Sequence, residues 1–184
     1  ARVVLRALRG GFPGDHGFLF KGPFHVDSLM RLPLVWRPAP SRAVQPSVVS
    51  EPVGLLDLAP TFCRIAGLPV PEWMDGEPLP MSPADAGAQG RQRVLTEWDS
   101  VHPGGAEVHL QTITRHALVC TRYEPGTCHD GTEGELWDLD EDPLQLVNLW
   151  DDPTRRSLRD DLVGDLVEAL PERPRTPLGL EAPV

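Results

Sequence analysis

The stretch that most constrains the fold is the glycine-rich segment from Gly10 to Arg37, GGFPGDHGFLFKGPFHVDSLMRLPLVWR. It holds five glycines, an adjacent Asp-His pair and the protein's only lysine, Lys21. Short apolar runs precede and follow its loop, at residues 3–5 and 32–36. A glycine-rich loop between two apolar strands is typical of the functional loops of α/β enzymes. The sequence therefore predicts that this loop carries a site, or part of one.

Apolar runs and turn residues predict the elements of the first half. They are a strand at 3–7, a loop at 8–22, one or two helical turns at 23–31, a strand at 32–37 and a helix at 54–67. In that last helix, Leu55, Leu58, Phe62 and Ile65 form one apolar stripe, which is expected to face the core. Asp57 can cap its first turn. A Pro- and Gly-rich stretch at 68–90 then predicts a boundary between two domains, at 1–80 and 91–184.

The second half changes to a pattern of strands. They are expected at 94–98, 108–114, 117–123 and 135–139, and an amphipathic helix at 154–170 follows them. The strands at 108–114 and 117–123 are predicted to pair as a hairpin across Arg115 and His116. Antiparallel strands followed by one helix indicate a small α+β unit.

Composition limits the partners and the compartment. A net charge of −10 argues against a nucleic acid or an anionic membrane, because both need clustered Lys and Arg. No apolar run approaches the length of a membrane span. Three cysteines without Cys-x-x-Cys spacing fit a reducing compartment. With no signal peptide, this favours a cytoplasmic location, provided that Ala1 lies close to the true start.

Two features of the loop could carry chemistry. Asp15 and His16 could bind a divalent metal, with Asp27 or Asp57 as a further ligand, or they could only stabilise the loop. Lys21 could place a compact positive charge against an anionic oxygen, or it could be a surface lysine.

His25 follows Lys21 by four residues and has two interpretations. It could contact a substrate, or it could pack in the core. The remaining histidines lack the spacing of a zinc site. The sequence also has no P-loop, no Gly-x-Gly-x-x-Gly and no Gly-x-Ser-x-Gly motif.

The segment GDHGFLFKGPFHVDSLMRLPLVWR resembles the second half of the active-site region of the sulfatase family, in the alkaline-phosphatase superfamily. Three further stretches resemble segments of that family in the same order. They are VGLLDLAPTFCRIAGLPVPEWMDGEPL at 53–79, QTITRHALVCTRYEP at 111–125 and GELWDLDEDPLQLVNLWDDP at 134–153. Their joint presence is far more specific than any one of them.

The resemblance implies an α/β fold (alkaline-phosphatase-like, partial) followed by a small α+β antiparallel sheet with a closing helix. Residues 1–80 would be the carboxy-terminal remnant of the catalytic domain and 91–184 the small subdomain. The family hydrolyses sulfate esters, and some members act on phosphonate or phosphate esters. Its nucleophile is a formylglycine made in a Cys-x-Pro-Ser-Arg motif, and a calcium-type divalent ion activates it.

The family's site residues transfer only in part. Lys21 aligns with the lysine that contacts the substrate's anionic oxygens. Asp15 and His16 align with a second Asp-His-Gly, and the metal-binding pair would fall at Leu8 and Arg9, where neither side chain can bind a cation. The Cys-x-Pro-Ser-Arg motif is absent from the 184 residues. The expectation is therefore no metal cofactor for this chain alone, and a calcium-type ion only in the full-length family.

These observations predict part of a sulfatase-type hydrolase that is inactive alone. Residues 1–9 depart from the family pattern while everything from Gly10 fits it, which indicates an altered reading frame, an altered start or a split protein. The expected partners are a small anionic ester and either a missing amino-terminal half or a second copy of the chain. Two alternatives stay open, a non-catalytic interaction module and a metal-binding module derived from the family. Trp73, Trp98 and His102 are candidates for the mouth of the substrate pocket, or for packing.

Overall fold

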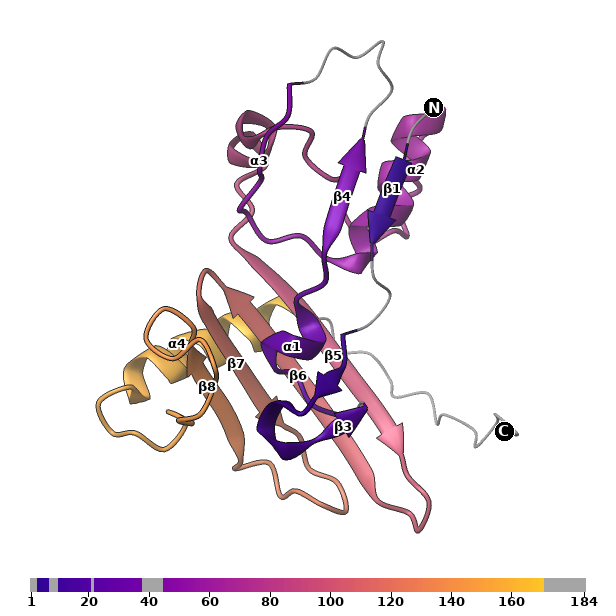
Figure 1. The fold of residues 1–184 in the computed structure, drawn as a ribbon. Coiled ribbons are helices and arrows are strands. Elements are labelled where there is room, and N and C mark those ends of the chain that lie inside the picture. Colours follow the sequence, from indigo (N-terminus) through magenta and orange to yellow (C-terminus); the bar gives the residue numbers. More distant parts are fainter. Residues whose placement is uncertain (1–2, 7–9, 21, 38–44, 171–184) are drawn as a thin grey trace. The chain divides into compact units, whose positions relative to one another are not determined.

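Residues 3–6, 10–20, 22–37 and 45–170 are described by a computed structural model of the chain (Figure 1). The chain forms two compact units, and each unit combines two separate segments of sequence. The first unit is built from Ala1–Leu5 and Leu34–Val94, and the second from Arg6–Pro33 and Leu95–Val184. The predicted division at residues 80–91 stays a prediction, but packing groups the glycine-rich loop with the second unit.

The first unit combines a short sheet with helical segments. Strands β1 (Val3–Arg6) and β4 (Leu34–Arg37) form a two-stranded sheet, as the apolar runs predicted. The helical segments are η3 (Leu55–Asp57), α2 (Leu58–Ala66) and α3 (Pro83–Gln89). Helix α2 ends at Gly67, whose φ of 74° is left-handed and therefore favours glycine.

The burial of α2 differs from the prediction. Leu55 and Phe62 keep 54% and 50% of their surface exposed, so the apolar stripe does not face the core of the described residues. Asp57, Pro60 and Thr61 are buried instead. Polar groups can be buried on this side of the helix because they are hydrogen-bonded. The Thr61 hydroxyl donates to the Asp57 carbonyl at 2.5 Å and accepts the Leu79 N–H at 2.7 Å.

Helix α3 was not predicted, although its sequence carries standard terminal signals. The Ser82 hydroxyl accepts the N–H of Asp85 at 3.2 Å, and Pro83 occupies the first turn. Gly90 ends the helix with a φ of 63°. The surrounding stretch is rich in Pro and Gly, a composition that favours a loop over a helix.

The second unit is organised around a four-stranded antiparallel sheet with the strand order β5-β6-β7-β8. Its strands are β5 (Arg93–Val101), β6 (Glu107–Arg115), β7 (Leu118–Tyr123) and β8 (Gly134–Asp138). The predicted hairpin is confirmed, because Arg115 pairs with Leu118 and the register runs back to Leu110 opposite Tyr123.

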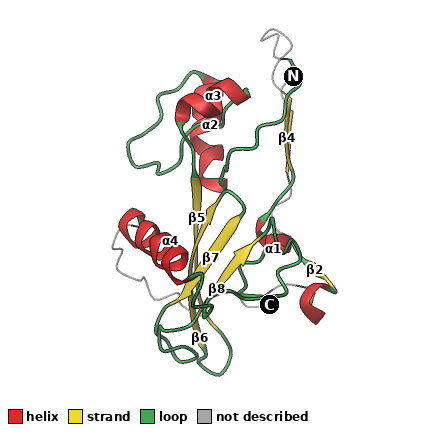
Figure 2. Ribbon diagram, turned by 90° about the vertical axis from the view of Figure 1, so that its left-hand side faces the viewer, coloured by secondary structure: helices red, strands yellow, loops and turns green. Residues whose placement is uncertain are grey.

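Helix α4 (Arg156–Ala169) covers one face of this sheet (Figures 1 and 2). The core between them consists of five fully buried side chains, Ile113, Cys120, Leu136, Leu162 and Leu166. Leu162 and Leu166 come from the helix, at the spacing that brings side chains to one face. The closing helix and its apolar face are therefore as predicted.

The opposite face of the sheet is covered by the glycine-rich segment (Figure 2). This segment contains the short strands β2 (Phe12–Pro13) and β3 (Leu19–Phe20), the turn η1 (Asp15–Gly17) and helix α1 (Asp27–Met30). His25 and Val26 are buried there, as are Thr112 and Thr121 of the sheet. Among the described residues, no helix has the length and apolar character needed to cross a bilayer.

Candidate functional site

The glycine-rich segment closes on itself at its base. The Gly10 N–H donates to the Leu29 carbonyl at 3.3 Å. A side chain at position 10 would collide with the carbonyl oxygen of Ser28, so this approach requires glycine. The segment between Gly10 and Leu29 therefore begins and ends at the same place, where these two residues are hydrogen-bonded. Phe18 and Leu19, between these ends, keep 46% and 70% of their surface exposed.

Several residues of the predicted site lie outside the described part of the chain. Lys21 is one of them, and its contact with a substrate anion stays a prediction. Leu8 and Arg9, the positions aligned with the family's metal pair, are also outside it.

The Asp15-His16 pair lies in the turn η1. His16 has a left-handed φ of 53° and an exposed side chain. Across the described residues, no three His, Cys, Asp or Glu side chains come together as a possible metal site. Metal binding by Asp15 and His16 therefore stays a prediction.

His25 is buried rather than presented to solvent. Its side chain is 3% exposed, and Nδ1 lies 2.6 Å from the Thr112 hydroxyl on strand β6. That hydroxyl is also 2.8 Å from the Thr121 hydroxyl on β7. Burial lowers the pKa of His25 to about 4, so the imidazole is neutral at pH 7. The predicted role in substrate binding is untested, and the geometry places His25 in a buried polar row.

A second buried contact fixes the segment two residues further on. The Asp27 N–H donates to Gln145 Oε1 at 2.7 Å, across 118 positions of sequence. Gln145 is 3% exposed and has a left-handed φ of 53°. Its Nε2 is buried without a hydrogen-bond partner. No local sequence signal identifies this contact, because Gln145 lies in a turn that is far from α1 in the sequence.

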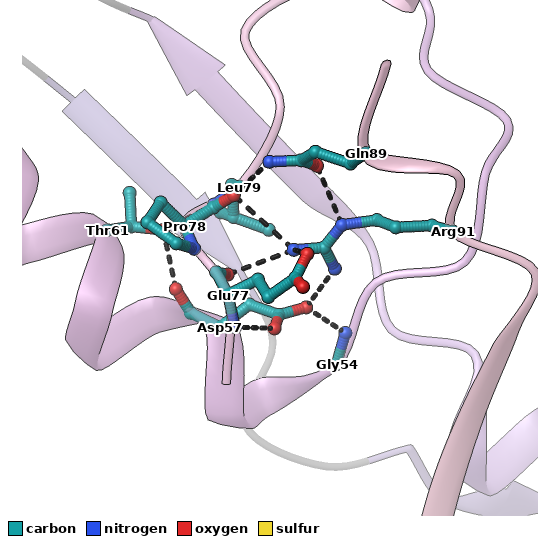
Figure 3. A network of polar contacts seen from close by, with 8 residues as sticks. All are labelled: Gly54, Asp57, Thr61, Glu77, Pro78, Leu79, Gln89 and Arg91. Atoms are coloured by element: carbon teal, nitrogen blue, oxygen red, sulfur yellow. Dashed lines mark hydrogen bonds and ion pairs between the residues drawn. The ribbon is translucent and has the colours of Figure 1, made fainter. Parts of the chain in front are cut away.

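The most extensive polar network belongs to the first unit and centres on Asp57 (Figure 3). Its Oδ2 accepts the Gly54 N–H at 2.8 Å and the Arg91 guanidinium at 2.7 Å, and its Oδ1 accepts the Glu77 N–H at 3.0 Å. The predicted cap of the first turn is therefore present. The suggestion that Asp57 is a metal ligand stays a prediction; in the structure both carboxylate oxygens accept hydrogen bonds within the protein.

Arg91 connects this carboxylate to the loop before α3 (Figure 3). Its Nη2 donates to the carbonyls of Glu77 and Pro78 at 3.0 and 3.3 Å, and its Nε donates to Gln89 Oε1 at 2.8 Å. Such a set uses the planar fork of the guanidinium. No local sequence signal identifies the pairing of Asp57 with Arg91, because the two residues are 34 positions apart.

Three polar side chains on the β5–β6 hairpin form a surface row. The Trp98 indole N–H donates to the Ser100 hydroxyl at 2.8 Å, and that hydroxyl lies 3.0 Å from His102 Nε2. Trp98 is 37% exposed. In the other unit, Trp73 is 76% exposed. Both tryptophans are accessible, but whether they line a substrate pocket stays a prediction.

The three cysteines differ in exposure, since Cys128 is exposed, Cys63 is half-buried and Cys120 is buried. All three are free thiols in the structure. Burial raises the pKa of Cys120 to about 12, which keeps its thiol protonated at neutral pH.

Comparison with known families gives a match along most of the chain. Residues 14–171 match the family described as N-sulphoglucosamine sulphohydrolase, C-terminal. Among curated proteins, the Delta 4,5-hexuronate-2-O-sulfatase of Bacteroides thetaiotaomicron is 27% identical over 174 residues. That match covers 88% of this chain but 34% of the relative, so the chain spans about a third of the relative's length.

Solved structures show the same fold. The phosphonate monoester hydrolase of Agrobacterium radiobacter aligns with a TM-score of 0.76 at 24% identity, over 91% of this chain and 34% of that enzyme. A further structure, solved with its substrate D-glucosamine-2-N,6-O-disulfate, aligns with a TM-score of 0.68 at 21% identity, over 91% of this chain and 33% of that one. The predicted alkaline-phosphatase-like architecture with its small antiparallel sheet is therefore confirmed.

Proposed function

The chain belongs to the N-sulphoglucosamine sulphohydrolase C-terminal family, and from this premise we propose that it is the carboxy-terminal part of an ester hydrolase that supplies one cationic residue to the active site. That residue is Lys21. Its role is to bind the anionic oxygens of a sulfate ester, or of a phosphonate or phosphate ester. The observation that carries the proposal is the family match over residues 14–171, which includes the loop around Lys21.

The chemistry assigned to Lys21 is electrostatic. A lysine ammonium is a compact charge with three donors, and it stabilises negative charge that develops on sulfuryl or phosphoryl oxygens. The nucleophile would come from a part of the enzyme outside these 184 residues, because they contain no Cys-x-Pro-Ser-Arg motif. The divalent ion of the family would supply Lewis acidity and activate that nucleophile. On this proposal the 184-residue chain does not turn over substrate alone.

The exposed apolar side chains of the first unit support a larger assembly. Leu56 and Trp73 keep 63% and 76% of their surface exposed, in addition to Leu55 and Phe62. Apolar groups that gather on one segment usually mark a surface that another part of a protein covers. The proposed cover is the remainder of the catalytic domain, which the longer relatives possess.

Relatives provide the substrate class. A structural neighbour was solved with D-glucosamine-2-N,6-O-disulfate, and the curated relative is a hexuronate sulfatase. A sulfated sugar is therefore the substrate proposed for the complete enzyme. The phosphonate monoester hydrolase among the neighbours makes an aryl phosphonate the second substrate to assay.

The proposal is tested in two steps. First, the DNA upstream of the Ala1 codon is read for an in-frame Cys-x-Pro-Ser-Arg motif, and the extended frame is expressed. Second, the extended protein and the 184-residue chain are assayed with an aryl sulfate and an aryl phosphonate ester. We expect turnover by the extended protein only. Turnover by the 184-residue chain would contradict the proposed incompleteness, and a missing upstream motif would leave the interaction module as the better interpretation.

The role of Lys21 is tested in the active protein. Lys21→Ala is expected to lower kcat/KM by about 10²- to 10³-fold, the usual effect of removing one group that stabilises developing charge. The matched control is Arg31→Ala, since this guanidinium is 80% exposed and lies beyond the loop. Equal losses in the two variants would indicate a general charge effect and contradict the assignment.

A further inference from the structure

We propose that His25 and Gln145 are positioning residues, which hold the loop that carries Lys21 in place on the antiparallel sheet. The importance of that loop rests on the proposed function. The anchoring itself rests on contacts within the second unit, so it can be tested without any enzymatic activity.

The first contact is the buried polar row of His25, Thr112 and Thr121. Each of the three side chains is at most 3% exposed, and the distances between neighbouring polar atoms are 2.6 and 2.8 Å. Thr112 is the middle member, so removing its hydroxyl would take this partner from both His25 Nδ1 and the Thr121 hydroxyl, and a buried polar group left unpaired costs more than the net gain of one hydrogen bond. The row therefore fixes the position of His25 on strands β6 and β7.

The second contact is strained, and its strain indicates a specific role. Gln145 adopts a left-handed φ, which a residue with a Cβ rarely does, and it buries an Nε2 that has no partner. Both features are unfavourable, and they persist only where the surroundings enforce them. In this conformation Gln145 Oε1 accepts the N–H of Asp27, the first residue of α1.

The turn around Gln145 is itself held rigidly. The Gln145 N–H donates to the Asp142 carbonyl at 3.1 Å, and the Asp142 carboxylate accepts the N–H groups of Leu146 and Val147 at 2.6 and 2.8 Å. An acceptor on a rigid turn can define where α1 begins. A mobile surface loop could not do this.

Together the two contacts fix the base of the loop. His25 and Asp27 are two residues apart, and Leu29 closes the loop by accepting the Gly10 N–H. Three points within five residues thus tie the segment to the sheet and to its own start. Fixing the base of a loop reduces the conformational entropy that the loop can lose when a ligand binds.

The experiment is hydrogen exchange of the 184-residue chain, read amide by amide. In Gln145→Leu, the Asp27 N–H loses its acceptor, and we expect amides at residues 25–31 to exchange about 5- to 100-fold faster. Thr112→Val removes the hydroxyl that lies beside His25 Nδ1, so it should also speed the exchange of amides at residues 25–31. Amides of β6 and β7 outside the substituted position should keep their exchange rates.

Gln145→Glu separates the hydrogen bond from simple space filling. A glutamate keeps an acceptor oxygen for the Asp27 N–H, so at a pH low enough to keep this buried carboxyl neutral the variant should recover most of the protection that Gln145→Leu loses. The matched controls are Thr114→Val, two residues along β6, and Ser28→Ala, which removes a buried hydroxyl that has no partner. Both controls should leave the exchange of residues 25–31 unchanged.

Two results would overturn the proposal. One is faster exchange spread evenly over the sheet and the loop, which would show that these residues contribute only to global stability. The other is an unchanged loop in Gln145→Leu and Thr112→Val. Neither result would bear on the proposed hydrolase function, which the assays of the extended protein decide.

Discussion

The guanidinium of Arg91 lies 2.7 Å from the carboxylate of Asp57, and the two side chains keep only 9% and 10% of their surface exposed. A buried ion pair contributes little net stability compared with an apolar pair, yet removing one partner leaves the other charge without compensation. This relationship makes the first unit sensitive to single substitutions at either position.

We expect Arg91→Ala to lower the free energy of unfolding by about 3–5 kcal/mol, because it leaves the Asp57 carboxylate unpaired and buried. Urea unfolding followed by circular dichroism measures the change. Arg91→Lys should recover only part of the loss, since an ammonium cannot reproduce the guanidinium contacts with Gln89, Glu77 and Pro78. Arg64→Ala, at an exposed position of α2, should change stability by less than about 0.5 kcal/mol. Equal effects at positions 91 and 64 would contradict the network.

His25 makes the stability of the second unit depend on pH. Its pKa is about 4 in the folded chain and near 6.5 when unfolded, so below pH 6.5 the unfolded state binds more protons. The stability contributed by neutral His25 is complete above pH 6.5 and is lost as the pH falls toward 4. Between pH 7.5 and 5 the loss should be about 2 kcal/mol.

The effect of His25 is separated from that of other groups by comparing the wild-type chain with His25→Asn at each pH. Between pH 7.5 and 5 the difference in unfolding free energy between the two proteins should shrink by about 2 kcal/mol, because asparagine does not titrate. A difference that stays constant from pH 7.5 to 5 would mean that His25 is accessible to protons in the folded chain.

The closure of the glycine-rich loop predicts opposite effects of two glycine substitutions. Gly10→Ala should destabilise the chain, because its methyl group would meet the backbone of Ser28 and Leu29 and break the bond to the Leu29 carbonyl. Gly164→Ala lies in an exposed part of α4 with no neighbouring atoms in reach, and should stabilise it by about 1 kcal/mol. Thermal unfolding of both variants provides the measurement. A neutral Gly10→Ala would show that the base of the loop is open.

The three thiols should differ sharply in reactivity toward a disulfide reagent such as DTNB. Cys128 is exposed and should react first, and Cys63 is partly exposed and should follow. Cys120 is buried with a pKa near 12, so it should react only when the chain unfolds. Stopped-flow absorbance on Cys128→Ser and Cys120→Ser variants assigns the phases. Fast reaction of Cys120 in the folded chain would contradict the packing of α4 on the sheet.

Local signals in the sequence sufficed for most of the second unit. The alternation along β6 and β7 gave the hairpin and its turn at His116, and the spacing of Leu162 and Leu166 gave the closing helix. In both cases one face of the element is buried, so apolar residues recur at a short, regular spacing along the sequence. The short helix α3 was missed even though Ser82, Pro83 and Gly90 mark its ends.

Long-range contacts could not be predicted in the same way. The apolar stripe through Leu55 and Phe62 was expected to be buried, but periodicity shows only that a helix has an apolar face, and does not identify what covers it. The pairing of Asp57 with Arg91, and of Asp27 with Gln145, depends on how distant segments pack. For the candidate site, the resemblance predicts a role for Lys21, which stays a proposal, while the buried contacts of His25 and Gln145 are seen only in the structure.

The chain passes between its two units three times, because the first unit takes Ala1–Leu5 and Leu34–Val94 while the second takes Arg6–Pro33 and Leu95–Val184. Neither unit can therefore be obtained as a single continuous gene segment. A clone that begins at Arg93 would include the four-stranded sheet and α4 but would lack His25 and Val26, which are buried with the sheet. Thr112 and Thr121 would then face water. Measurements on this fragment would therefore describe a surface that is buried in the native chain.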